Sequence, residues 1–333
     1  MARIYFKDAT TMQSALNIIG EELILVEQQF RKDLESDVPL IRKVGEYVLS
    51  SGGKRVRPAL LLLAARLCGY CGNKAVPLAS VVEFIHTATL LHDDVVDSAT
   101  LRRGIASANT LWGNEASVLV GDFLFSKSFS LMVGVGSLDI LRIFSGATTI
   151  IAEGEVMKLL CTGEIDLTEE RYIGVVRSKT AILMSAACEA GAVLGAVSLE
   201  KQKALADFGM DLGIAFQLMD DTLDYIATEE EFGKSIGHDL EEGKITLPLI
   251  HTLRHCSTDE KDAIEAVIDK DEMSIDEFRH VSGLVKQYGG IDYTIDTARR
   301  YISSCLAHLN PFEAGPVRDA MLQLADYVVT RSK

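Results

Sequence analysis

The spacing of apolar residues predicts helices along almost the whole chain. Val81, Phe84, Ile85, Ala88 and Leu91 recur at intervals of three and four residues, which places them on one face of a helix. Alternating strand patterns are nearly missing. None of the six prolines falls between residues 78 and 247, and long helices fit this span because proline breaks helix interiors. We therefore expect an all-α protein.

Polar and glycine-containing breaks divide this pattern into separate helices. Thr168 precedes two glutamates and predicts a capped helix start, whereas the polar, charged segment 228–244 predicts a functional or mobile loop. The expected helices span 11–34, 38–51, 58–68, 76–98, 107–113, 116–133, 138–160, 168–195, 200–227, 245–255, 258–270, 275–287, 291–308 and 312–330. No repeat or linker is visible, so we expect one domain of bundled helices over residues 1–333.

Composition narrows the classes of function. The chain has 333 residues, of which 48% are hydrophobic, so it can bury a sizeable core. Its 33 Lys and Arg against 48 Asp and Glu give a net charge of −15, which argues against a nucleic-acid partner. No uninterrupted apolar run approaches the roughly 18 residues of a membrane helix, and the N-terminus lacks a signal-peptide pattern. We expect a cytoplasmic protein without a transmembrane segment.

Two acidic motifs carry the sharpest chemical signal. Each follows an apolar helical run, and they comprise Asp93, Asp94 and Asp97, then Asp220, Asp221 and Asp224. Residues four apart share a helix face, so the first and last acid of each motif point together. Like charges held this way cost free energy unless a cation joins them. Oxygen-only ligands suit Mg²⁺, which keeps waters and bridges substrate phosphates.

These acids also have plainer interpretations. One such motif is typical of a solvated helix end, but two copies, each behind apolar residues, favour a lined cleft. A di-iron bundle requires Glu-x-x-His motifs, which are missing here. The single C-x-x-C pair, Cys68 and Cys71, has no second pair or nearby His to complete a zinc site, although a redox or metal role stays open.

The basic residues gather beside the acids. Lys54, Arg55 and Arg57 open a helix behind two glycines, and helix starts favour anions. Arg102 and Arg103 follow the first acidic motif, and guanidinium groups bind phosphate oxygens bidentately. The remaining polar candidates are Lys179 and Thr180 within an apolar helix, Gln217 just before the second motif, and Lys234 and Lys244 after it. Two phosphate-bearing ligands with magnesium explain this set.

At these residues the sequence resembles the trans-isoprenyl diphosphate synthase, or polyprenyl synthetase, family. The segments GGKRVRP, LLHDDVVDSATLRRG, KTA, FQLMDDTLDY and GKSIGHDLEEGKITLP occur in the family's order, and the resemblance covers residues 20 to 330. VLVGDFLFSKSF and AEGEV point to its bacterial octaprenyl diphosphate synthase group. The resemblance implies long antiparallel helices around a central cavity (the isoprenoid synthase fold), a homodimer, and about two or three Mg²⁺ ions per active site.

The family's site residues carry over onto matching positions. The resemblance implies that Asp93, Asp94, Asp97, Asp220 and Asp224 bind magnesium, with Asp221, Lys179 and Thr180 also catalytic. It implies that the allylic diphosphate is bound by Arg102, Lys179, Thr180, Gln217, Lys234 and Lys244. Isopentenyl diphosphate would be held by Lys54, Arg57, His86 and Arg103. The implied activity adds isopentenyl units head to tail to an allylic diphosphate and makes a long all-trans polyprenyl diphosphate, octaprenyl above all, for respiratory quinones.

Chain length is expected to depend on residues one turn below the first acidic motif. In the family, bulky aromatic residues at the positions of Ala88 and Thr89 accompany short products, so these small residues favour a long one. Helix 116–133 would close the tunnel with Phe125, Phe129 and Met132. Ordinary core packing is the alternative for each of these three side chains.

Three rival functions remain open at this point. A farnesyl or geranylgeranyl diphosphate synthase uses the same chemistry but needs a shorter tunnel. A non-catalytic partner subunit of a heteromeric synthase should have lost acids or arginines, and this chain keeps them. A magnesium-dependent phosphohydrolase would need neither the two basic clusters nor an apolar tunnel.

Overall fold

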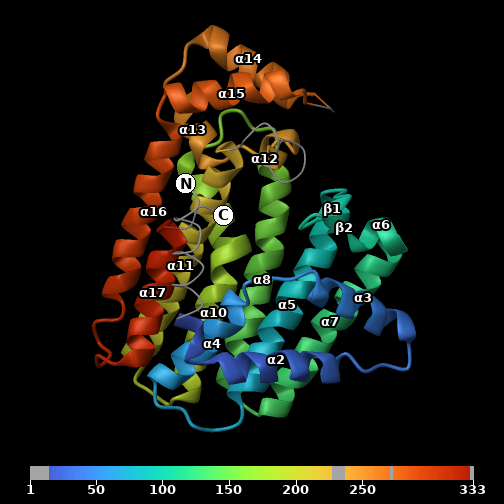
Figure 1. Ribbon diagram of the computed structural model, residues 1–333, viewed down its shortest axis with the longest axis vertical. Coiled ribbons are helices and arrows are strands. Elements are labelled where there is room, and N and C mark those ends of the chain that lie inside the picture. The colour runs from blue at the N-terminus through green and yellow to red at the C-terminus, as the bar shows by residue number, and fades with distance from the viewer. Residues whose placement is uncertain (1–14, 227–236, 271–272, 331–333) are drawn as a thin grey trace.

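The computed structural model describes residues 15–226, 237–270 and 273–330, and this part of the chain is almost entirely helical (Figure 1). The described strands form one short antiparallel hairpin, β1 (Leu101–Arg102) and β2 (Ile105–Ala106). The helices are α2 (Gly20–Asp33), α3 (Pro39–Ser50), α4 (Val56–Leu67), α5 (Ala75–Val96), α6 (Ala108–Trp112), α7 (Asn114–Val135), α8 (Leu138–Cys161), α9 (Glu169–Val176), η1 (Arg177–Ala181), α10 (Ile182–Leu194), α11 (Leu199–Tyr225), α12 (His238–Glu241), α13 (Leu247–Leu253), α14 (Thr258–Ile268), α15 (Ile275–Gln287), α16 (Gly290–Ala307) and α17 (Pro316–Thr330). The all-α prediction is confirmed.

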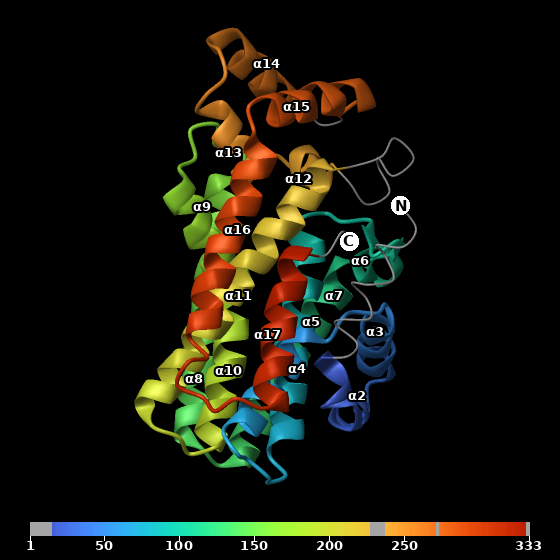
Figure 2. The ribbon, with the colours of Figure 1, turned by 60° about the vertical axis from the view of Figure 1, so that its left-hand side comes forward.

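The long helices form a bundle whose functional end is easily located. α10 packs against both α4 and α11, α11 packs against α16, and α5 packs against α7. α14 and α15 cover one end of the bundle, and the C-terminal ends of α5, α8 and α11 point toward that same end (Figures 1 and 2). The two acidic motifs therefore reach the same end of the molecule although they lie far apart in the sequence.

Glycines allow the central helices to approach closely. A Cβ added at Gly213 of α11 would lie 2.5 Å from the Cα of Ala181, and one added at Gly209 would lie 2.5 Å from the carbonyl oxygen of Met184. On the other side of α10, a Cβ at Gly191 would lie 2.6 Å from the carbonyl oxygen of Leu61. The backbones of α4, α10 and α11 are thus in near contact, which fixes the positions of the side chains above them.

The predicted helix 168–195 contains one turn that the apolar pattern did not predict. Thr168 caps its start and accepts a hydrogen bond from the Arg171 amide, as expected. The segment η1 is a π turn, which inserts one extra residue into the helix and is often found at functional sites. It allows the consecutive residues Lys179 and Thr180 to line the same cavity, although neighbours on a regular α-helix point about 100° apart.

Other boundaries differ modestly from the predictions. The last helix begins at Pro316 rather than at 312, because residues 308–311 form a turn and residues 312–315 are not helical. The segment expected to be a loop contains the short helix α12, and residues 227–236 lie outside the described part of the chain. The hairpin β1–β2 was also not predicted, because two-residue strands leave no alternation to detect.

Two helices are long and apolar enough to span a membrane by length and composition. In α5, 61% of the apolar window is buried inside the molecule, as in the core helix of a folded domain, but in α7 only 33% is buried. The buried fraction of α5 agrees with the expectation of no transmembrane segment, whereas much of the apolar surface of α7 is exposed in the single chain.

Gly213→Ala should lower the stability of the fold by about 1–3 kcal/mol, because the new methyl group meets the backbone of η1 rather than a flexible side chain. Gly283→Ala in α15 is the matched control: nothing lies within 4 Å of its added Cβ, and alanine favours a helix over glycine by up to about 1 kcal/mol. Urea unfolding followed by circular dichroism measures both. Equal stability of the two variants would contradict this account of the packing.

Candidate active site

A cavity of about 640 Å³ lies at the end of the bundle where the acidic motifs meet. Side chains from α4, α5, α8, η1, α10 and α11 line it. The predicted residues that it brings together are Lys54, Arg57, His86, Thr89, Asp93, Asp97, Arg102, Arg103, Lys179, Thr180, Gln217, Asp220 and Lys244. Residues separated by almost 200 positions in the sequence therefore line the same cavity, and both acidic motifs contribute to it.

The first acidic motif ends α5 and divides its carboxylates between two environments. Asp93 and Asp97 line the cavity. The Lys179 ammonium lies 3.0 Å from Asp93, and Lys158 donates to both oxygens of Asp97 at 2.6 and 2.8 Å. Asp94 is only 2% exposed and accepts hydrogen bonds from Arg102 instead. Asp94 thus fixes Arg102 rather than facing the cavity.

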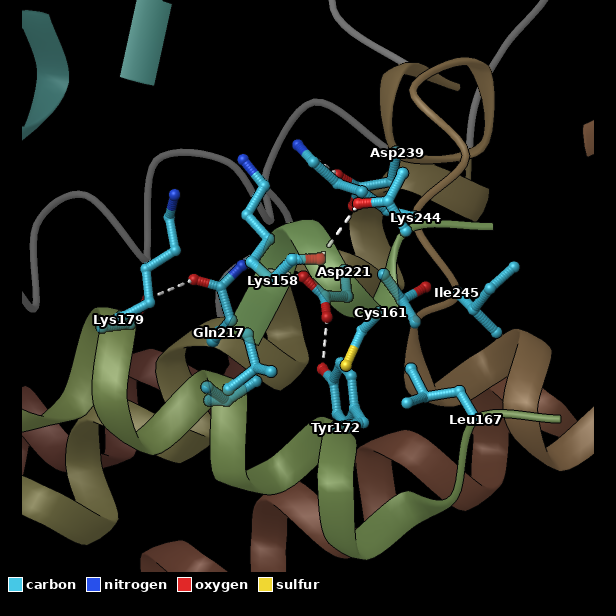
Figure 3. A pocket seen from close by; sticks show the side chains of 15 residues that line it. Lys158, Cys161, Leu167, Tyr172, Lys179, Gln217, Asp221, Asp239, Lys244 and Ile245 are labelled. Carbon is cyan, nitrogen blue, oxygen red and sulfur yellow. Dashed lines mark hydrogen bonds and ion pairs between the residues drawn. The ribbon is translucent and has the colours of Figure 1, made fainter. Parts of the chain in front are cut away.

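The second acidic motif ends α11 and is divided in a similar way. Asp220 lines the cavity, whereas Asp221 is buried and accepts hydrogen bonds from the Tyr172 hydroxyl and from the Gln217 amide at 2.8 Å (Figure 3). Asp224 accepts hydrogen bonds from the backbone amides of Gly237 at 2.8 Å and Asp239 at 3.1 Å. Asp221 and Asp224 therefore hold neighbouring segments in place.

The charges on the two acidic walls are balanced differently. Burial raises the pKa of Asp97, but the hydrogen bonds and charge of Lys158, together with the charges of Lys244 and Lys179, outweigh that effect and lower the pKa overall. On the second wall, burial and the nearby Asp239 carboxylate raise the pKa of Asp224 to about 7 and the pKa of Asp221 well above its usual range. Helix C-termini add a negative potential at both motifs. On the second wall, the hydrogen bonds that Asp221 and Asp224 accept come from neutral groups rather than from an ammonium.

The donor set fits a magnesium ion that arrives with a phosphate ligand. Among the described residues, no group of three or more His, Cys, Asp or Glu side chains is arranged to hold a metal ion by itself. Mg²⁺ is commonly bound by one or two carboxylates together with substrate phosphates and waters. The oxygen ligands of Asp93, Asp97 and Asp220 face one cavity and suit that mode. Metal binding by all five predicted aspartates stays a prediction, and Asp94 and Asp224 do not line this cavity.

A cluster formed by Arg57, His86 and Arg103 also lines the cavity. The Arg57 guanidinium lies 3.3 Å from His86 Nε2, and the Arg57 Nε–H is buried without a hydrogen-bond partner. Burial and the neighbouring Arg57 and Arg103 hold the pKa of His86 well below its usual range, so its imidazole is neutral. Arg103 has a φ of 53° and donates to the carbonyl of Gly52. Glu83 attracts both guanidinium groups, but no ion pair joins Arg57 or Arg103 to a carboxylate of the described residues, so their donors can bind an anion.

A chain of hydrogen bonds connects the π turn with the second acidic motif. Thr180 donates to Gln217 Oε1 at 2.9 Å, and Gln217 in turn donates to Asp221. Burial lowers the pKa of Lys179, but Asp93 and Glu155 outweigh it and raise the pKa overall, so Lys179 is an ammonium. The Lys179 ammonium, the Thr180 hydroxyl and the Gln217 amide are thus held by neighbouring side chains along the cavity wall between the two motifs.

Two of the predicted lysines follow the second motif. Lys244 lines the cavity and pairs with Glu242 and, at 3.5 Å, with Asp239. Lys234 lies outside the described residues, so its role stays a prediction.

The residues expected to set chain length separate into two groups. Thr89 lines the cavity, whereas Ala88 is fully buried in a core between α2, α3, α5 and α7. Phe125 and Phe129 are half-buried with ring centroids 5.6 Å apart, and Met132 is fully buried. None of these four lines the 640 Å³ cavity. The tunnel floor therefore stays a prediction, and Thr89 is the position that contacts the cavity directly.

Comparison with known proteins agrees with this geometry. Residues 38–285 match the family described as polyprenyl synthetase. The chain belongs to the polyprenyl synthetase family. Octaprenyl diphosphate synthase of Escherichia coli strain K12 is 43% identical over 324 residues, which is 96% of this chain and 97% of that protein. The predicted family and the trans-prenyltransferase class of enzyme are confirmed.

Solved structures of the polyprenyl synthetase family have the same fold. A polyprenyl synthase from Caulobacter crescentus CB15, complexed with calcium and isoprenyl diphosphate, is 41% identical with a TM-score of 0.92 over 97% of this chain and 98% of that one. A decaprenyl diphosphate synthase from Rhodobacter capsulatus is 40% identical with a TM-score of 0.92 over 97% and 99%. The isoprenoid synthase fold is thereby confirmed.

Four residues of the site were missed by the sequence reasoning. Glu155 and Lys158 pair with Lys179 and Asp97, Glu83 pairs with Arg55 at 2.8 Å, and Tyr172 binds Asp221. Glu83 and Lys158 are charged residues with mainly apolar neighbours in the sequence, whereas Glu155 and Tyr172 stand close to other polar residues. An unpaired charge among apolar neighbours is costly, and that signal was applied only to Lys179.

Asp224→Asn should stabilise the metal-free protein at about pH 8 and have little effect below the ordinary carboxyl pKa of 3.8. The folded pKa of about 7 lies above the unfolded value, so the stability that protonated Asp224 contributes is present at low pH and is lost as pH rises through that range. Thermal unfolding in chelator measures the difference. A wild-type protein as stable as the variant at high pH would contradict a strained carboxylate here.

Proposed function

We propose that the protein condenses isopentenyl diphosphate head to tail with an allylic diphosphate and produces a long all-trans polyprenyl diphosphate. The observation that supports this most directly is one cavity lined both by carboxylates of the two acidic motifs and by a cluster of cations. The carboxylates of Asp93, Asp97 and Asp220 suit a diphosphate that is bound through a divalent cation. The guanidinium groups of Arg57 and Arg103 suit a second diphosphate bound directly.

The division of roles follows from the contacts. Asp93 and Asp97 orient the allylic diphosphate, and Lys179 donates to its oxygens as the bond to carbon breaks. Mg²⁺, when bound, neutralises charge on the departing diphosphate. Gln217, fixed by Asp221, turns its amide oxygen and the Thr180 hydroxyl toward the carbocation. Arg57, Arg103, Lys54 and His86 hold isopentenyl diphosphate so that its double bond faces that carbon, and this alignment supplies much of the rate.

The proton released after condensation is assigned to the departing diphosphate. Asp93 and Glu155 share the Lys179 ammonium, and Asp97 binds Lys158 through both oxygens. The hydrogen bonds and charge of Lys158, together with Lys244 and Lys179, outweigh burial and lower the pKa of Asp97, so Asp97 is a poor proton acceptor. The diphosphate, by contrast, gains negative charge at the moment when the proton must leave.

A long product and a homodimer complete the proposal. Relatives of the chain include octaprenyl and nonaprenyl diphosphate synthases, and the small residue Thr89 leaves the cavity open below Asp93. α7 and α8 expose apolar side chains that a second copy would cover: Leu119 (66% exposed), Val133 (65%), Leu159 (57%) and Leu160 (72%). We place the enzyme in the cytoplasm, where its polar diphosphate substrates are dissolved.

Asp93→Ala and Asp220→Ala should each reduce condensation by at least about a hundredfold, because each removes a carboxylate that faces the diphosphate. The assay combines protein, Mg²⁺, farnesyl diphosphate and labelled isopentenyl diphosphate, and it sizes the dephosphorylated products. Asp207→Ala is the matched control on α11, since Asp207 pairs with the exposed Lys203 away from the cavity. Near-normal activity of both cavity variants would refute the two-wall site.

The same assay separates the rival functions. A dominant long product supports the proposal. A product that stops at farnesyl or geranylgeranyl diphosphate would retain the chemistry and identify a shorter-chain enzyme. No condensation, with substrate binding intact, would indicate a non-catalytic partner subunit.

Thr89→Phe should shorten the product, because the ring would project into the cavity below Asp93. Ala88→Tyr, the change suggested by the sequence alone, is a poorer test since Ala88 is fully buried and a large ring there would overpack the core. Thr258→Phe, on the exposed start of α14, introduces the same ring elsewhere and serves as the control. An unchanged product from Thr89→Phe would show that the tail takes another path.

A further inference from the structure

Lys158 has a contact that none of the predicted roles explains. It lies on α8, and its ammonium donates to Asp97 Oδ1 at 2.6 Å and to Oδ2 at 2.8 Å. Both side chains are largely enclosed, with 11% of Lys158 and 19% of Asp97 exposed. Both oxygens of a carboxylate that faces the cavity are therefore occupied by one cation.

The neighbouring turn of α8 repeats this arrangement around Asp93. Glu155, three residues before Lys158, holds the Lys179 ammonium at 2.8 Å, and Lys179 lies 3.0 Å from Asp93. The two acids of the first motif that face the cavity are thus each paired with an ammonium group, although Asp93 shares Lys179 with Glu155. By contrast, Asp221 and Asp224 on α11 accept hydrogen bonds from neutral groups.

An ammonium and a divalent cation compete for the same lone pairs on Asp97. Mg²⁺ needs a carboxylate oxygen at about 2.0–2.1 Å, and its two positive charges would repel an ammonium that stays on the same carboxylate. Binding of the metal at Asp97 therefore requires that Lys158 moves away. Figure 3 shows Lys158, Lys179 and Lys244 extending toward the same side of the small pocket that they line, which gives a released Lys158 other lysines as neighbours and favours an anion beside them.

We propose that Lys158 is a positioning residue that neutralises Asp97 until a divalent cation replaces it, and that Lys158 thereby sets the affinity of the first acidic wall for that cation. The diphosphate promotes this exchange because its oxygens accept hydrogen bonds from the Lys158 ammonium once that group has left Asp97. The inference rests on the proposed function for the identity of the diphosphate, but the competition for Asp97 does not depend on turnover.

The test measures binding of Mn²⁺ rather than activity. Wild-type protein, Lys158→Met and Lys158→Gln are titrated with Mn²⁺ while free Mn²⁺ is followed by electron paramagnetic resonance, with and without inorganic pyrophosphate. Without pyrophosphate, both variants should bind Mn²⁺ about tenfold more tightly than the wild type, the effect of losing one partly buried ion pair. Pyrophosphate should tighten binding more in the wild type than in the variants.

Two controls connect the effect to Asp97. Lys203→Gln removes an equally short ion pair, to Asp207, on the exposed surface and should leave Mn²⁺ affinity unchanged. In an Asp97→Asn background, Lys158→Met should change the affinity less than about twofold, because the shared carboxylate is gone. Thermal unfolding confirms that each variant is folded.

Unchanged or weaker Mn²⁺ binding in both Lys158 variants would overturn the proposal, as would a full effect in the Asp97→Asn background. These outcomes are distinct from failure of the proposed function. If the wild type makes no polyprenyl product but the Lys158 variants bind Mn²⁺ more tightly, the function is wrong and the role of Lys158 stands. If the wild type makes the long product but the Lys158 variants bind Mn²⁺ with unchanged affinity, the proposed function stands and the role of Lys158 is wrong.

Discussion

Repulsion among carboxylates at one end of the helix bundle is the constraint on which the rest of the site depends. Asp93, Asp97 and Asp220 face the same cavity, and the C-terminal ends of two helices add to the negative potential there. Without compensation this arrangement would destabilise the fold. On α5 the compensation is built in as Lys158 and Lys179, whereas on α11 it comes from hydrogen bonds and from raised carboxyl pKa values. The imbalance prepares the cavity for cations that arrive with a substrate.

The charged side chains are held in place by the close packing of helix backbones below the site. Glycines such as Gly209 and Gly213 let α11 lie against α10 and η1, and the π turn directs both Lys179 and Thr180 into the cavity. Tyr172, from the preceding α9, then fixes Asp221 and through it Gln217. Positions in the site are consequently set by helix packing, which resists small displacements. An enzyme that must align two diphosphates benefits from this rigidity.

Most of the fold and much of the site were predictable from local patterns, and the exceptions have physical reasons. The spacing of apolar residues and the lack of proline between 78 and 247 predicted the helices. The acidic motifs and the nearby arginines predicted several of the side chains that line the cavity. The π turn was not predictable because it rotates the following residues around the helix axis, while the apolar composition of the helix stays the same. Lys158 was missed because its partner Asp97 lies 61 residues away, and Ala88 was assigned to the cavity although its helix face packs against the core. Pairing across helices is a property of packing, which one sequence does not reveal.

The central claim is that a diphosphate is held between two acidic walls by divalent cations. It is tested most directly by a crystal structure with Mn²⁺ and a non-reactive thio analogue of the allylic diphosphate, in which anomalous scattering locates the metal. The account predicts manganese bound to Asp93 or Asp97 and manganese bound to Asp220, with the diphosphate between them and Lys158 released from Asp97. A diphosphate bound in the cavity with no manganese at either wall would contradict it.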